Sequence, residues 1–249
     1  MYTPEVAKFY SLVYYPKLEL LCDVIQCDMN TDKTKAFETF YKQFSIRNYK
    51  KGEMLIRADD DPQGIFCLTK GYVRQYTISK TGFELSLHIL KPISYFPMVW
   101  AINGTPNVYY FEALTPVEVG RAPREQVVEF IKDKPIIIFE LMSELLEDYA
   151  ESMTRIEHLV FSDAYRRVIS ILLYIAKHFG EKKGTNTIIH HRFTQQDIAT
   201  LVGVARETAG IELLKLEKKG LVKYVDHSML FDNIKNLERE LSSVSSAKS

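Results

Sequence analysis

A short segment near the C-terminal end constrains the fold more than any other part of this 249-residue chain. Two runs of apolar side chains at helical spacing lie on either side of Gly203. Thr194 can cap the first helix, Asp197 can return the bond as an imperfect capping box, and Gly220 can end the second helix. The expected inner-face residues are Ile198, Leu201 and Val202 in the first helix and Ala205, Ala209, Leu213 and Leu216 in the second. Two short helices joined by a sharp glycine turn predict a helix-turn-helix.

The outer face of the second predicted helix carries side chains suited to reading base pairs. At 100° per residue, Glu207 and Ile211 lie opposite the inner face, and Arg206 and Gly210 flank them. An arginine can donate two hydrogen bonds to guanine, and a glutamate can accept one from cytosine. The hydroxyl and amide groups suited to phosphates are those of Thr194, Gln195 and Thr208, and Ala205 and His227 complete the predicted DNA contacts.

Residues 135–162 predict one long helix, which Pro135 can open. The first of its two apolar stripes comprises Ile138, Met142, Leu145, Tyr149, Ser152, Ile156 and Leu159, and the second comprises Phe139, Leu146, Met153 and Val160. The first stripe alternates four and three residues apart, as in a two-stranded coiled coil. We expect one stripe to pack on the chain's own β-rich region and the other on the same helix of a second subunit. This predicts a C2 homodimer, and the alternative is a helix buried wholly within its own chain.

Between residues 46 and 120, short β-rich runs alternate with turn residues, which predicts a small antiparallel barrel or roll. The sequence therefore predicts an α+β protein. Its expected parts are an N-terminal helical extension (1–30), a β-roll with a leading helix (31–134), the dimerisation helix (135–162) and a winged helix-turn-helix (163–249) with wing strands at 221–225 and 229–231.

The net charge is zero, but the charges are unevenly distributed. Residues 164–249 hold 14 Lys and Arg against 9 Asp and Glu, whereas residues 1–163 hold 18 against 23. A basic C-terminal part favours a polyanionic partner such as double-stranded DNA. The longest apolar run, 168–176, is too short to span a bilayer, and the N-terminus lacks a secretory pattern. We therefore expect a cytoplasmic protein with no membrane partner.

These features resemble the CRP/FNR family of regulators. The resemblance covers residues 51–241 and is strongest at residues 206–208 and Gly210, which match the family's recognition helix. Residues 70–74 resemble part of the family's roll. The resemblance implies a homodimeric, sequence-specific, DNA-binding transcription regulator with a cyclic-nucleotide-binding-like jelly roll. A palindromic site would be its target, and RNA polymerase would be a partner if the protein activates transcription.

One residue of the recognition helix departs from the family pattern. Many relatives carry an arginine directly after the position of Gly210, and this chain has Ile211. An apolar side chain cannot replace a guanine contact, but it can pack on a thymine methyl group. The departure predicts a DNA half-site with one fewer G·C requirement.

The roll departs further from the family. In cAMP-responsive relatives, a Gly-Glu pair and a later arginine hold the ring phosphate, because a buried phosphate needs such partners. The corresponding residues here are 96–97 and 107–108, and residues 92–120 contain no Lys or Arg. We expect no cAMP response unless Arg74 or another segment supplies a cation. The aromatic side chains either line a pocket for an unknown small-molecule effector or fill it, and filling is favoured. The candidate pocket residues are Arg74, Phe96, Trp100, Asn107, Tyr149 and Ser152.

Other chemistry finds little support in the sequence. Three cysteines are too few for a four-thiolate iron–sulfur cluster, and Cys22 and Cys27 are either a redox pair or, as we favour, buried thiols. A cupin-like metalloenzyme needs several histidines in the roll, which has His88 alone. A third alternative is a ligand-binding module whose winged helix serves protein contacts. We predict no cofactor, no metal site and no enzymatic activity.

Overall fold

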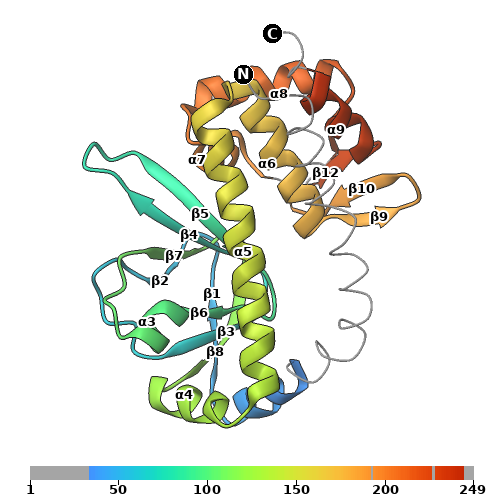
Figure 1. Cartoon of the computed structure of the whole chain (residues 1–249). Helices are drawn as coiled ribbons and strands as arrows, with labels where there is room; N and C mark the ends of the chain where they lie inside the picture. The colour runs from blue at the N-terminus through green and yellow to red at the C-terminus, as the bar shows by residue number, and fades with distance from the viewer. Residues whose placement is uncertain (1–33, 192, 226–227, 244–249) are drawn as a thin grey trace, which may run out of the picture.

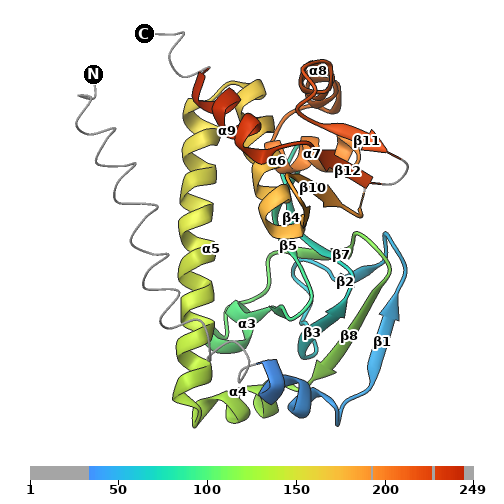
Figure 2. The same cartoon turned by 90° about the vertical axis from the view of Figure 1, so that its right-hand side faces the viewer.

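The computed structural model describes residues 34–191, 193–225 and 228–243. The predicted extension over 1–30, Cys22, Cys27 and the predicted DNA contact His227 lie outside the described residues. The described chain forms a β-roll, a long helix α5 (Pro135–Phe161) and a C-terminal winged region that lies beyond the roll along the same helix (Figure 1, Figure 2). This arrangement confirms the predicted α+β class.

Two four-stranded antiparallel sheets make the roll. The first has the order β1 (Ile46–Tyr49), β8 (Val117–Ala122), β3 (Ile65–Lys70), β6 (Tyr95–Phe96), and the second has the order β2 (Met54–Ile56), β7 (Tyr110–Ala113), β4 (Val73–Ile78), β5 (Glu84–Leu90). Alternate side chains of each strand point to opposite faces of its sheet. The inward ones, including Leu68, Val73, Phe111 and Val119, are almost completely buried and form the interior of the roll.

A second core lies where helices cover the roll. It joins the helix that includes residues 34–41 to α3 (Met98–Asn103), α4 (Arg124–Lys132) and the first turn of α5. Phe37 is fully buried in this core, and its ring stacks on Tyr95 with 4.0 Å between ring centroids. The start of α5 is therefore fixed to the roll by apolar packing.

The long helix appears where it was predicted, but its faces are used differently. Both predicted stripes remain largely exposed, with Leu145 at 63% and Tyr149 at 60% exposure. The face turned towards the rest of the chain is a third one, which carries the buried Ile137 and Glu140 and, further along, Arg155. The expectation that one stripe packs on the roll is wrong, because the buried residues of α5, Ile137 and Glu140, lie on this third face together with Arg155.

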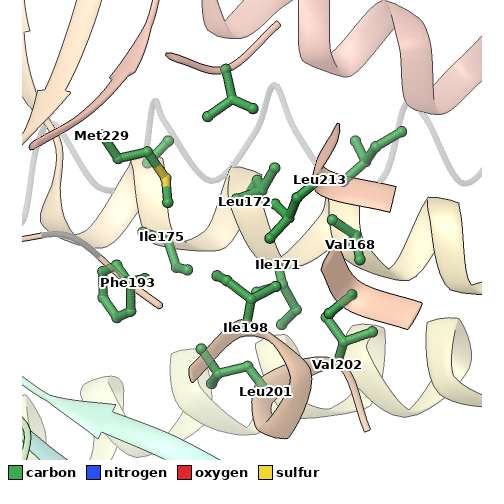
Figure 3. Close-up of a cluster of buried hydrophobic side chains, with 14 of the residues drawn as sticks. Val168, Ile171, Leu172, Ile175, Phe193, Ile198, Leu201, Val202, Leu213 and Met229 are labelled. Carbon is green, nitrogen blue, oxygen red and sulfur yellow. The ribbon is translucent and has the colours of Figure 1, made fainter. Parts of the chain in front are cut away.

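The C-terminal region is a winged helix. Its elements are α6 (Ala164–Phe179), β9 (Glu181–Lys183), β10 (Asn186–Ile189), α7 (Gln195–Val202), α8 (Arg206–Lys218), β11 (Lys223–Val225), β12 (Ser228–Phe231) and α9 (Ile234–Ser243). Asp163 caps α6 by accepting a 3.0 Å hydrogen bond from the Arg166 amide. Figure 3 shows the apolar side chains of α6, among them Ile171 and Ile175, gathered with those of α7, α8 and β12. This core packs the two helices of the helix-turn-helix against α6.

The predicted wing is confirmed as the hairpin of β11 and β12. The same sheet continues through β10 to β9, in the order β11-β12-β10-β9. The β9–β10 hairpin was not predicted, because residues 181–183 are all charged and exposed and carry no alternating pattern.

Candidate DNA-binding interface

The helix-turn-helix begins with a complete capping box. The Asp197 amide donates to Thr194 Oγ1 at 3.1 Å, and the Thr194 amide donates to Asp197 Oδ2 at 2.7 Å. Asp197 thus replaces the usual glutamate, and two amides at the start of α7 are satisfied. At the other end, Gly203 adopts φ +73°, which turns the chain from α7 towards α8. Each of these features was predicted from the sequence.

The inner face of α8 is confirmed for three of its four predicted residues. Ala209, Leu213 and Leu216 are buried against α6 and α7. Ala205 is exposed instead, because the helix begins at Arg206 and Ala205 is an extended N-cap residue with ψ 150°. Ala205 therefore lies on the surface, beside the side chains predicted to meet DNA.

The outer face of α8 presents a mixed surface to solvent. Arg206, Glu207 and Ile211 are exposed, the last at 55%, and Thr208 is half-buried. The side chains of Arg206 and Glu207 make no hydrogen bond or ion pair with the residues that the structure describes. A guanidinium and a carboxylate thus stand unpaired at adjacent positions in the first turn of α8.

Gly210 does not face solvent as predicted. It is buried, and a Cβ atom built on it would lie 3.1 Å from Gln195 Oε1. The missing side chain makes room for the Gln195 amide, which lies over α8. Gly210 is therefore a packing position that places Gln195 at the interface.

A shallow groove runs between the start of α7 and the outer face of α8. Its lining residues are Phe193, Thr194, Gln195, Gln196, Arg206, Gly210, Leu213, Leu214, Glu217 and Tyr224. The positive end of the α7 dipole opens at this groove, as is typical of phosphate-binding surfaces. Gln196, Glu217 and Tyr224 were not among the predicted contacts. The signal for Gln196 was its place in the first turn of α7, directly after Gln195.

Arg74, the candidate cation for an effector, is already paired on the outer face of β4, because it follows the inward-pointing Val73 and points to the opposite side of the sheet. Its Nη2 atom lies 2.9 Å from carboxylate oxygens of both Glu84 and Glu112, and its guanidinium carbon lies 4.0 Å from the centroid of the Tyr76 ring. The cross-strand register of β4 and β7 places Arg74 opposite Glu112. Two carboxylates around one buried arginine leave an excess of negative charge, which disfavours a phosphate there.

The other candidate pocket residues are spread over separate places. Phe96 is 2% exposed and stacks between Phe66 and Phe111, with ring centroids 5.5 and 5.0 Å away. The buried Asn107 braces a loop by donating to the carbonyls of Arg57 and Tyr109, at 3.1 and 2.7 Å. The roll interior is filled at these positions, as the sequence favoured.

The three remaining pocket candidates lie elsewhere. Trp100 belongs to the helical core and has the Arg124 guanidinium 5.7 Å from its ring centroid. Tyr149 and Ser152 lie on α5, the former exposed and the latter largely so. The structure therefore does not bring the six predicted residues into one cavity, because each makes its own local contacts or faces solvent.

The described residues offer neither a metal-binding cluster nor a membrane-spanning helix. Nowhere in them do three or more His, Cys, Asp or Glu side chains gather in a way that could hold a metal ion. None of their helices is both long and apolar enough to cross a membrane.

Comparisons with known proteins agree with this geometry. A family model described as a cyclic nucleotide-binding domain matches residues 46–134, and one described as a Crp-like helix-turn-helix domain matches residues 166–240. The CRP-like cAMP-activated global transcriptional regulator of Mycobacterium tuberculosis H37Rv is 24% identical over 204 residues, which cover 82% of this chain and 91% of that protein. The global nitrogen regulator of Nostoc sp. PCC 7120 is 24% identical over 203 residues, covering 78% and 91%.

The fold has counterparts among solved structures. A CRP/FNR-family transcriptional regulator from Thermus thermophilus is similar with a TM-score of 0.62 at 21% identity, covering 80% of this chain and 98% of that one. The two matched models account for both the roll and the winged helix, and they favour a regulator over the cupin-like enzyme. The chain belongs to the CRP/FNR family of DNA-binding transcription regulators.

Proposed function

We propose that the protein binds a palindromic DNA site as a homodimer and reads each half-site with the outer face of α8. The observation that carries the proposal is the unpaired, exposed pair Arg206 and Glu207 at the start of α8. This helix lies at the end of the molecule away from the roll (Figure 2). Arg206 can donate two bonds to guanine, and Glu207 can accept from cytosine. Ile211 would pack on a thymine methyl group, which reduces the G·C requirement of the half-site.

The phosphate contacts would come from the edge of the groove. Thr194, Gln195 and Thr208 lie near the starts of α7 and α8, where backbone amides and short polar side chains can bind phosphate oxygens. Thr194 already accepts a bond from the Asp197 amide, so its hydroxyl hydrogen remains to serve the phosphate. These contacts position the helix and carry no sequence information.

The exposed face of α5 supports the homodimer. Its large apolar side chains with 40% exposure or more are Ile136, Ile138, Phe139, Met142, Leu145, Leu146, Tyr149, Met153, Ile156, Val160 and Phe161. Burying the apolar area that these side chains still expose would stabilise an assembly by about 25 cal/mol per Å². A second copy of α5 suits the four-and-three spacing of this face and would set two α8 helices about 34 Å apart, in successive major grooves.

The roll supports a regulator that does not respond to cAMP. The position that would receive the ring phosphate has no Lys or Arg nearby in sequence, and Arg74 is paired with Glu84 and Glu112. The names of the relatives do not suggest a single effector either, because one is cAMP-activated and another is a nitrogen regulator. RNA polymerase would be a further partner if the protein activates transcription.

Selection from random double-stranded DNA with the full chain tests this function. We expect enriched palindromes with a fixed centre-to-centre spacing of about one helical turn, and an affinity that falls steeply with salt. The matched control is Arg206→Ala with Glu207→Ala, which should keep the fold and lose the enrichment. Failure to enrich any sequence, or a strictly monomeric protein in solution, would contradict the proposal.

A further inference from the structure

Arg155 joins three parts of the molecule through one guanidinium group. It is the sole arginine of α5 and lies half-buried on the face turned towards the chain's own body. Its Nη1 atom donates to the Leu87 carbonyl at 2.8 Å, and its Nη2 atom donates to the carbonyls of Ser86 and Leu201. The first and second of these carbonyls belong to β5 of the roll, and the third belongs to α7 of the helix-turn-helix.

The bond to Leu201 occupies a special position on α7. Leu201 lies in the last turn of this helix, where carbonyls lack partners within the helix and the dipole is negative. A guanidinium there is a charge-assisted cap. Because its donors project in a rigid planar fork, three bonds to carbonyls fix the place of α7 relative to both β5 and α5.

Two further contacts reinforce the same junction. The Ser86 hydroxyl donates to Thr200 Oγ1 at 2.9 Å, and Thr200 donates in turn to the Asp197 carbonyl at 2.9 Å. The turn at Gly203 lies against Leu85 of β5 and Leu159 of α5, because a Cβ atom built on Gly203 would lie 3.5 and 3.4 Å from their side chains. The polar bonds of Arg155 are thus flanked by apolar packing.

Stability alone does not explain an arginine at this position. Its Nε atom is buried without a hydrogen-bond partner among the described residues, which is unfavourable. No ion pair of Arg155 with a carboxylate is found in the described part of the chain either. A methionine of similar length could fill the space without removing a charge from water. What the guanidinium adds is a defined geometry between three backbone segments.

We propose that Arg155 is a positioning residue that sets the orientation of the helix-turn-helix and therefore the spacing between the two recognition helices of the dimer. This inference rests on the proposed function. Met153 lies about 160° around α5 from Arg155 and Ile156 about 100° around it, and both belong to the exposed face that would meet the second copy. The path from the dimer contact to α7 therefore runs through one turn of helix and one side chain.

The test measures how DNA affinity depends on the length of the spacer between the two half-sites. Palindromes of the selected half-site are prepared with the spacer shortened or lengthened by one base pair, together with a probe that carries a single half-site. The wild-type protein should prefer one spacer sharply. Arg155→Met should lose that preference by about fivefold or more, while its affinity for the single half-site stays unchanged. Arg155→Lys should lie between the two, because an ammonium group lacks the planar fork.

A matched control removes another guanidinium. Arg124 Nε donates to the Ala101 carbonyl at 2.7 Å within the roll and its covering helices, so Arg124→Met should keep the wild-type spacer profile. If Arg155→Met does not fold, Arg155→Lys and Ser86→Ala decide, since both weaken the junction mildly. Folded, dimeric Arg155 variants with the wild-type profile overturn this inference alone. A wild-type protein that binds no DNA overturns the proposed function and this inference with it.

Discussion

The roll and the helix-turn-helix both carry an arginine that suits a phosphate or a base, but they use it in opposite ways. In the roll, Arg74 is buried between two carboxylates, and the neighbouring interior is filled by stacked rings such as Phe96 and Phe111. In the helix-turn-helix, Arg206 is exposed and unpaired with any described residue. A side chain satisfied within its own chain serves the fold, whereas one left unsatisfied at the surface is available to a partner.

The largest expected effect tests whether the roll interior is filled by its own chain. Phe111→Ala should lower the free energy of unfolding by about 3–5 kcal/mol, because it leaves a cavity beside Phe96. Urea unfolding followed by circular dichroism measures this. Tyr110→Ala is the matched control, since Tyr110 is half-buried on the other face of β7 and should cost less. A loss below about 1 kcal/mol for Phe111→Ala would point to a roll that adapts around a ligand.

The next effect tests the exposed arginine. Arg206→Ala should weaken binding to the selected site by about 1–3 kcal/mol and leave unfolding almost unchanged. Fluorescence anisotropy with the selected site and with a scrambled site measures the difference. Arg239→Ala, which removes an exposed arginine of α9, is the control and should preserve the preference for the selected site. An equal loss on both DNA sequences for Arg206→Ala would reassign Arg206 to a phosphate.

A third test concerns three partly buried histidines, His88 of β5, His158 of α5 and His191 between β10 and α7. Burial lowers the pKa of His88, His158 and His191. His158 contacts Ser170 of α6, and His191 lies against Tyr72 of the roll. The groups facing His88 are Asp148, Glu151 and Arg155 of α5 and His178 of α6.

A lowered histidine pKa means that the folded state prefers the neutral ring. Below the usual pKa of 6.5, the unfolded chain binds more protons, so the stability present above that pH declines as the pH falls towards the folded-state values. Unfolding measured between pH 7.5 and 5.5 (roughly the range in which free histidine titrates) should show this decline, and His88→Gln should reduce its slope. A protein that becomes more stable on acidification would exclude this account.

A carboxylate that faces His88, that of Glu151, acts at lower pH. Although burial opposes it, hydrogen bonds from His178 and Lys177 lower the pKa of Glu151 to about 2. The stability that Glu151 contributes is present above pH 4.5 and is lost as the pH falls towards 2. The histidine and carboxylate contributions therefore separate into two pH ranges.

The last test uses cAMP, for which we expect no effect on stability. Millimolar cAMP should not shift the thermal midpoint of unfolding, because a ligand stabilises a protein only when it binds the folded state. The selected DNA duplex is the positive control and should raise the midpoint. A clear upward shift with cAMP would break the contrast between the two regions, since it would require either Arg74 to leave its carboxylate partners or another segment to supply a cation.

Most of the helix-turn-helix could be predicted because its signals are local. The Thr194 and Asp197 capping box, the left-handed Gly203 and the long helix all depend on neighbours within one or two turns. Strand texture was likewise sufficient to predict an antiparallel roll. The predictions that failed depend on contacts between residues that are distant in sequence.

The contacts of α5 illustrate the limit. The face that packs is decided by Arg155 meeting carbonyls 68 and 46 residues away, at Leu87 and Leu201, and no periodicity within α5 announces this. Arg74 looked free for a ligand until the register of β4 and β7 placed Glu112 opposite it. Gly210 looked exposed until Gln195 of another helix covered it.

The continuity of α5 has a mechanical consequence. Its 27 residues make a rod about 40 Å long, joined firmly to the roll at one end and to the winged region towards the other. A tilt of about five degrees at the end joined to the roll displaces the end at the winged region by roughly 3.5 Å, given this length. That displacement is close to the step between neighbouring base pairs along one DNA strand, about 3.4 Å. A small change in the angle between the roll and α5 can therefore move the winged region by about one base-pair step along the DNA.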